Sequence, residues 1–150
     1  MTLFTIGFTK KTAEQFFETL KHYGIDIVVD IRLNNKSQLA GFTKGEDLRY
    51  FLQEICHCEY VHDIALAPTK EILDDYKKNI ITWTEYEERF AALMNQPARL
   101  QQIKRFERRF AEYENVCLLC SEPTPEQCHR RLIAEMIESS SAHPIAVRHI

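Results

Sequence analysis

The stretch "IDIVVDIR", residues 25–32, decides the fold. At its centre Ile27, Val28 and Val29 are consecutive apolar, β-branched residues, which is typical of a strand buried on both faces of a parallel sheet. Parallel strands need long crossover connections, and these are usually helices. We therefore expect strands and helices to alternate along the rest of the chain.

The flanking segments follow that pattern. "LFTIGF" (3–8) predicts a first strand that ends at Gly7, and apolar residues at helical spacing predict a helix over 12–23 that Gly24 stops. The remaining expected strands are 59–63, 115–121 and 144–150, and the remaining expected helices cover 48–55, 68–78, 82–95, 100–110 and 125–139. The sequence predicts an α/β fold: a single three-layer domain over residues 1–150, with a mostly parallel sheet flanked by helices.

Composition narrows the classes of partner. The net charge of −3 gives no overall attraction to nucleic acid or anionic membranes, and no apolar run reaches the ~18 residues of a membrane span. The start "MTLFTIGFTKK" lacks the pattern of a signal peptide. Five cysteines form an odd set, which favours reduced thiols. We expect a cytoplasmic protein without a membrane partner.

Polar residues follow several of the expected strands. With strands 3–8, 25–32 and 59–63 side by side, the strand at 116–120 is expected on the other side of the first one. This order creates a topological switch point between strand 3–8 and strand 116–120, where ligands of open α/β sheets bind. The residues expected in that crevice are Gly7, Thr9, Asp30, Arg32, Cys120, Ser121 and Glu122.

The stretch "LLCSEPTPEQCHRRLIAEMI" (118–137) contains the densest group of reactive side chains. "TPEQ" predicts a helix start with Thr124 as N-cap, Pro125 in the first helical position and Gln127 closing a capping box. The free N–H groups of that start favour an anion, for which Arg130 is a bidentate partner. Glu122, in the preceding loop, is a candidate acid or base.

Other interpretations of the same residues stay open. His129 and Cys128 also suit plain core packing, and Cys120 is a possible nucleophile activated by His129. A metal site of Cys120, Cys128, His129 and Glu122 matches no zinc spacing, and adjacent residues diverge by ~100° around a helix, so we expect no metal. Cys117 and Cys120 lie three apart in a strand and should not form a disulfide.

Several motifs together resemble the DUF488 family: "FTIGF", "GIDIVVDIR", "EYVH" and "CLLCSEPTPEQCHRRLIAE". The resemblance implies a compact, cytoplasmic α/β domain and implies no activity. The positions that match the family signature are Gly7, Asp30, Arg32, Cys120, Glu122, Cys128, His129 and Arg130. Two segments depart from the common pattern, 33–45 and "ALAPT" (65–69), and both should border the crevice.

The leading hypothesis is an enzyme acting on a small anionic, nucleotide- or phosphate-like ligand. Arg32 and Arg130 would hold the anion, Glu122 or Asp30 would be the acid or base, and Cys120 and His129 would line the site with Gly7, Thr9, Ser121 and Cys128. Asp30 and Arg32 also suit a purely structural pair. The alternative is a non-catalytic ligand-binding module, or nucleic-acid binding through the basic face of helix 100–110, which holds Lys104, Arg105, Arg108 and Arg109. The sequence names no cofactor and no oligomeric state.

Overall fold

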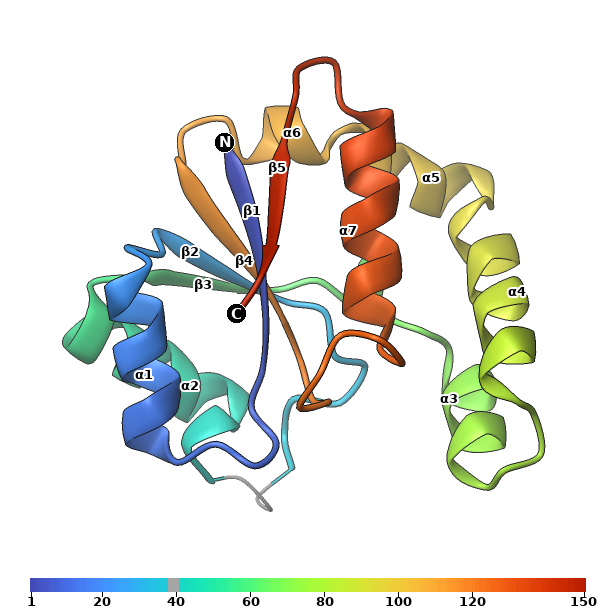
Figure 1. The fold of residues 1–150 in the computed structure, drawn as a ribbon, viewed down its shortest axis with the longest axis horizontal. Helices are drawn as coiled ribbons and strands as arrows, with labels where there is room; N and C mark the ends of the chain where they lie inside the picture. The colour runs from blue at the N-terminus through green and yellow to red at the C-terminus, as the bar shows by residue number, and fades with distance from the viewer. Residues whose placement is uncertain (38–40) are drawn as a thin grey trace.

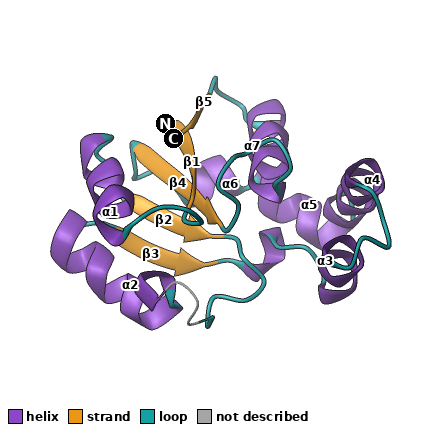
Figure 2. Ribbon diagram, turned by 60° about the horizontal axis from the view of Figure 1, so that its bottom comes forward, coloured by secondary structure: helices purple, strands orange, loops and turns teal. Residues whose placement is uncertain are grey.

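The computed structural model describes residues 1–37 and 41–150, and its centre is a five-stranded sheet in which every pair is parallel. The strand order is β3-β2-β4-β1-β5. The strands are β1 (Thr2–Gly7), β2 (Ile27–Asp30), β3 (Glu59–His62), β4 (Asn115–Cys120) and β5 (Ala146–His149). The α/β prediction is confirmed, with a sheet that is wholly parallel (Figures 1 and 2).

Helices cover both faces of the sheet. On one face α1 (Ala13–His22) and α2 (Gly45–Phe51) pack on the sheet, with η1 (Gly41–Thr43) before α2 and the π-helical turn η2 (Leu52–Cys56) after it (Figure 2). The other face carries the remaining helices. They are η3 (Ile64–Leu66), α3 (Lys70–Lys77), α4 (Trp83–Met94), α5 (Pro97–Lys104), α6 (Phe106–Arg109) and α7 (His129–Ser140). No helix in the described part of the chain has the length and apolar character to cross a membrane.

Alternation along the strands separates two hydrophobic cores. Leu118 of β4 packs in the core under α7, whereas its neighbour Leu119 packs in the core under α1. Successive side chains of a strand point to opposite faces, so a central strand needs apolar residues at every position. Residues 116–119 are all fully buried, as that rule requires.

The predicted strand order was partly wrong. β4 does pair with β1, but it lies between β1 and β2 instead of beyond β1. The physical reason is burial: β4 is the most apolar strand and takes the centre, while β3 and β5, which have exposed residues, take the edges. The carboxyl end of β4 therefore lies between those of β1 and β2.

Two predicted helices have other bounds. The last one begins at His129 and not at Pro125, and its N-cap, Cys128, is extended and makes no side-chain cap bond. Residues 125–128 form a separate turn ahead of the helix. A turn closed by the Cys128 N–H and the Pro125 carbonyl, 3.2 Å apart, replaces the predicted capping box.

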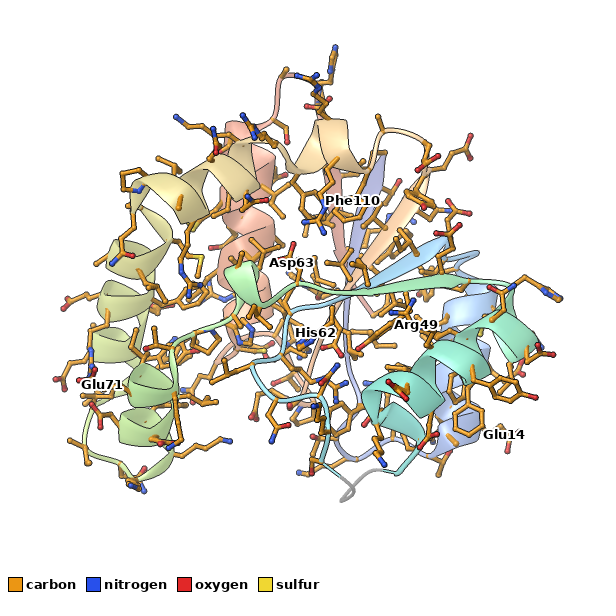
Figure 3. All side chains as sticks on the ribbon, turned by 180° about the vertical axis from the view of Figure 1, so that it is seen from behind. Glu14, Arg49, His62, Asp63, Glu71 and Phe110 are labelled. Atoms are coloured by element: carbon orange, nitrogen blue, oxygen red, sulfur yellow. The ribbon has the colours of Figure 1, made fainter. Side chains whose placement is uncertain are left out.

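The helix predicted over 100–110 is broken into α5 and α6 at Arg105. The break divides the basic residues that had been expected on one face. Arg109 also turns back to form an ion pair with Asp63, at the end of β3, and its guanidinium lies over the Phe110 ring (Figure 3). The predicted basic face is therefore not a continuous helical surface.

Candidate functional site

The carboxyl ends of three strands meet at one place. Cys120, the last residue of β4, lies in register with Gly7 of β1, and the Ile31 N–H after β2 donates to the Leu119 carbonyl over 3.1 Å. The Thr9 N–H donates to the Ser121 carbonyl, also over 3.1 Å. These backbone bonds bring the three predicted loops together. The connections of β1 and β4 leave on opposite faces, through α1 and α7 (Figure 2).

Three buried ligand-type side chains gather at this point. The sulfurs of Cys120 and Cys128 and a ring nitrogen of His129 all lie within 4.8 Å of one another. Sequence reasoning expected Cys128 and His129 to diverge because it placed both inside a helix. Cys128 is instead an extended N-cap, with φ −140° and ψ 138°, so its side chain turns towards that of the next residue. The sequence argument that the side chains of Cys128 and His129 point too far apart to share a metal was therefore wrong.

His129 is fixed in orientation by backbone and by an aromatic ring. Its Nε2 lies 2.8 Å from the Ile31 carbonyl oxygen, and the Phe90 ring packs 5.6 Å from its centroid. A carbonyl only accepts, so Nε2 carries the proton and donates it. Nδ1 of the neutral ring is then left with a lone pair, on the side where Cys120 lies at 3.5 Å.

The environment favours a thiolate on Cys120. A hydrogen bond from Cys128, which outweighs the opposing effect of burial, lowers the pKa of the Cys120 thiol, helped by the backbone N–H groups of Ser121 and Glu122. The same contact with Cys120 raises the pKa of Cys128, and burial adds to the rise. Cys120 is therefore the more acidic of the two thiols. A cysteine whose thiol pKa is lowered in this way is suited to act as a nucleophile or as a metal ligand.

A cavity of about 170 Å³ opens directly above this cluster. We call it the aromatic cavity, because rings from α3 and α4 form one wall: Tyr76, Trp83 and Tyr86. The rings of Trp83 and Tyr86 are stacked, with centroids 4.9 Å apart. Sequence reasoning missed this wall, because Trp83, Tyr86 and Phe90 have the spacing of an ordinary core stripe. The cavity is also lined by residues of β4, the loop after it and the start of α7: Cys120, Ser121, Glu122, Cys128 and His129.

A second, wider cavity of about 720 Å³ adjoins the first. We call it the lysine cavity, because Lys10, Lys11 and Lys77 line it together with Thr9. The two cavities share the lining residues Arg32, Asn34, Lys77 and Ser121. Both segments that depart from the common family pattern border them, through Leu33 and Asn34 on one side and Pro68 on the other; residues 38–40 lie outside the described part of the chain.

Asp30 and Arg32 form a buried pair. Asp30 is 0% exposed and accepts from Arg32 Nε at 2.8 Å, Arg32 Nη2 at 2.7 Å and the Tyr60 hydroxyl at 2.7 Å. Arg32 Nη2 also donates to the Thr43 carbonyl, and His62, where β3 ends in Figure 3, holds the Arg32 carbonyl. Asp30 lines neither cavity, and Arg32 and Tyr60 occupy both of its carboxylate oxygens, an arrangement that favours the structural alternative. Arg32 lines both cavities, but Asp30 occupies its guanidinium.

Arg130 also lies behind the site rather than in it. Its side chain is buried and donates from Nη1 to the Glu122 carbonyl over 2.6 Å, while its Nε has no partner within residues 1–37 and 41–150. It lines neither cavity. The same Glu122 carbonyl also packs against Gly7. A Cβ at position 7 would lie 1.7 Å from its oxygen, so only glycine fits there. Gly7 and Arg130 therefore position the loop that carries Ser121 and Glu122, whose own carboxylate is exposed.

Comparison with known proteins adds the family. A model of the domain of unknown function DUF488 matches residues 12–137. The chain belongs to the DUF488 family. The resemblance seen in the sequence is thereby confirmed, and the match runs from α1 to most of α7, whereas β1 and the loop that carries Thr9, Lys10 and Lys11 lie before it. No curated protein and no solved structure matches the chain.

Proposed function

We propose that this DUF488 protein binds and acts on a small anionic ligand that carries an aromatic ring, of the nucleotide type, in the two adjoining cavities. One observation carries the proposal: an aromatic wall and a lysine rim meet above a buried cluster of Cys120, Cys128 and His129. Concave sites that combine apolar walls with a few convergent polar groups are where small ligands bind.

The aromatic cavity suits a flat ring. Trp83 is partly exposed and stacked on Tyr86, and Tyr76 closes the same wall with its ring 5.6 Å from that of Trp83. Stacking of a base on such a surface contributes about 1–3 kcal/mol. Tyr86 is held in place because its ring also stacks on Phe90.

The lysine cavity suits the anionic part of the ligand. Lys10, Lys11 and Lys77 form no ion pair with any described residue, although the protein as a whole has a net charge of −3. A cleft lined by one sign of charge concentrates ligands of the opposite sign. Lys77 lines both cavities, so it can contact a phosphate in the lysine cavity while the ring of the same ligand lies against the aromatic wall.

Chemistry on the ligand would take place in the aromatic cavity, which Glu122 and the buried cluster both line. Glu122 lines the aromatic cavity, and no hydrogen bond from a described residue ties down its side chain, so it is free to act as an acid or base. Cys120 and His129 lie at the inner end of the same cavity. A non-catalytic module would leave the bound ligand unchanged, which chromatography of the released compound detects.

Replacing Lys77 by Ala is expected to weaken nucleotide binding about tenfold, because a charged hydrogen-bond donor to phosphate is lost. Calorimetry with adenosine monophosphate, adenosine and inorganic phosphate measures the effect. Lys78→Ala is the matched control, since Lys78 is the next residue, is exposed and lines neither cavity. Binding of the monophosphate should exceed that of either fragment, and equal losses in the two variants would count against the proposal.

A further inference from the structure

We propose that Cys120, Cys128 and His129 bind a zinc ion, or a soft divalent metal of similar preference, with the fourth coordination position facing the aromatic cavity. Thiolate and imidazole are the ligands that zinc prefers in proteins, and all three residues are at least nine-tenths buried. This inference goes beyond the proposed function and reverses the expectation of no metal drawn from the sequence.

The spacing of the three atoms fits one ion between them. With Zn–S bonds of about 2.3 Å and a Zn–N bond of about 2.0 Å, tetrahedral geometry sets a sulfur and a nitrogen about 3.5 Å apart and two sulfurs about 3.8 Å apart. Cys120 Sγ lies 3.5 Å from His129 Nδ1, and no pair in the group is more than 4.8 Å apart. Small side-chain rotations close the remaining distance.

His129 has the arrangement of a metal ligand. A ligating histidine donates its other ring N–H to a carboxylate or a backbone carbonyl, which fixes the tautomer. Here Nε2 meets the Ile31 carbonyl at 2.8 Å, which leaves the Nδ1 lone pair for the ion. The ring is further held by Phe90.

A metal would employ all three side chains of the group at once. The Cys120 sulfur lies 3.5 Å from Nδ1 and 3.9 Å from Nε2, over the ring rather than in line with the lone pair of one nitrogen. The Cys120 side chain therefore has to rotate before its sulfur and the Nδ1 lone pair can face the same ion, while the hydrogen bond of Nε2 to Ile31 is kept. A catalytic Cys–His pair needs the same rotation, so the metal count decides between the two.

The fourth position faces the aromatic cavity. The three residues line that cavity, and the Glu122 carboxylate is not within the ligand group. Zinc sites with three protein ligands and one open position are those that bind a water molecule or a substrate. The placement at the inner end of the cavity gives the metal direct access to a bound ligand.

Zinc counting on the full-length protein, purified without chelators from zinc-supplemented medium, tests the site. We expect about one zinc per chain in the wild type and in Cys117→Ala, and none in Cys120→Ala or Cys128→Ala. Cys117 is a matched control, because it lies on the same strand, is fully buried and faces the opposite side of the sheet.

A second test does not depend on whether the variants fold. In it, metal-free wild-type protein is titrated with Co²⁺. Saturable absorption bands of tetrahedral, thiolate-bound cobalt, reversed by zinc, support the site. A wild type without zinc, whose cobalt spectrum stays that of the hydrated ion, would overturn it. The titration contains no nucleotide, so its failure is distinct from a failure of nucleotide binding, which calorimetry measures on the metal-free protein.

Discussion

Asp30→Asn is expected to lower the free energy of unfolding by about 3–5 kcal/mol, the usual cost of breaking a buried ion pair from one side. Asp30 is 0% exposed and Arg32 is 4% exposed, so the variant leaves a guanidinium in the interior with no counter-charge. In the wild type, donors of Arg32 and Tyr60 bond to the two carboxylate oxygens of Asp30. The amide of the variant would place its own N–H groups opposite some of these donors. Urea unfolding of the two proteins measures the difference.

The exposed pair of Lys70 and Asp74 provides the control. Its N–O distance, 2.7 Å, equals that of the buried pair, but the Lys70 side chain is 84% exposed. Asp74→Asn should change stability very little, because solvent screens exposed ion pairs. Adding Arg32→Met to Asp30→Asn should recover part of the loss, since the unpaired charge is then removed. A loss no larger than that of Asp74→Asn would mean that the pair is not structural.

Gly7→Ala is expected to destabilise the protein by about 3 kcal/mol and to abolish ligand binding, because the added methyl group pushes the end of β1 away from the loop that follows β4. The added Cβ would lie 1.7 Å from the Glu122 carbonyl oxygen and 2.8 Å from Arg130 Nη1. The loop that follows β4 has to move away from β1, and Ser121 leaves the wall shared by the two cavities. Thermal unfolding and calorimetry report the two effects.

Gly41→Ala is the matched control for this variant. Among residues 1–37 and 41–150, no heavy atom lies within 4 Å of a Cβ built at Gly41, and its backbone needs no positive φ. Its stability should stay within about 0.5 kcal/mol of the wild type. A Gly7→Ala protein as stable as Gly41→Ala would show that the loop after β4 does not rest on β1.

Local signals predicted most elements of the fold. The helix at 12–23 was predicted from apolar residues at helical spacing and from the stop at Gly24, and the structure adds a capping box of Thr12 and Gln15, with hydrogen bonds of 2.9 and 3.1 Å. Continuous apolar runs likewise located β2 and β4. The order of the strands depends on which segment gains most from burial on both faces, a comparison between distant segments that no local pattern contains.

The candidate site was predictable only in part. Residues that follow strand ends, such as Ser121 and Thr9, were placed correctly beside each other, because parallel strands end on one edge. The aromatic wall was missed, since core packing gives Trp83 and Tyr86 the same spacing. The meeting of Cys128 with His129 was missed because residues 125–128 form a turn where a helix start was predicted, and a shift of four residues in that start changes which side chains converge.

Trp83 fluorescence is the most direct test of the central claim, which is that an anionic ligand with an aromatic ring binds in the aromatic and lysine cavities. The chain has one tryptophan, and it lies in the wall of the aromatic cavity. Titration with adenosine monophosphate should give a saturable change in emission that Lys77→Ala shifts to higher concentration and Lys78→Ala does not. Emission that stays unchanged with every nucleotide, in folded protein both with and without added zinc, would contradict the account.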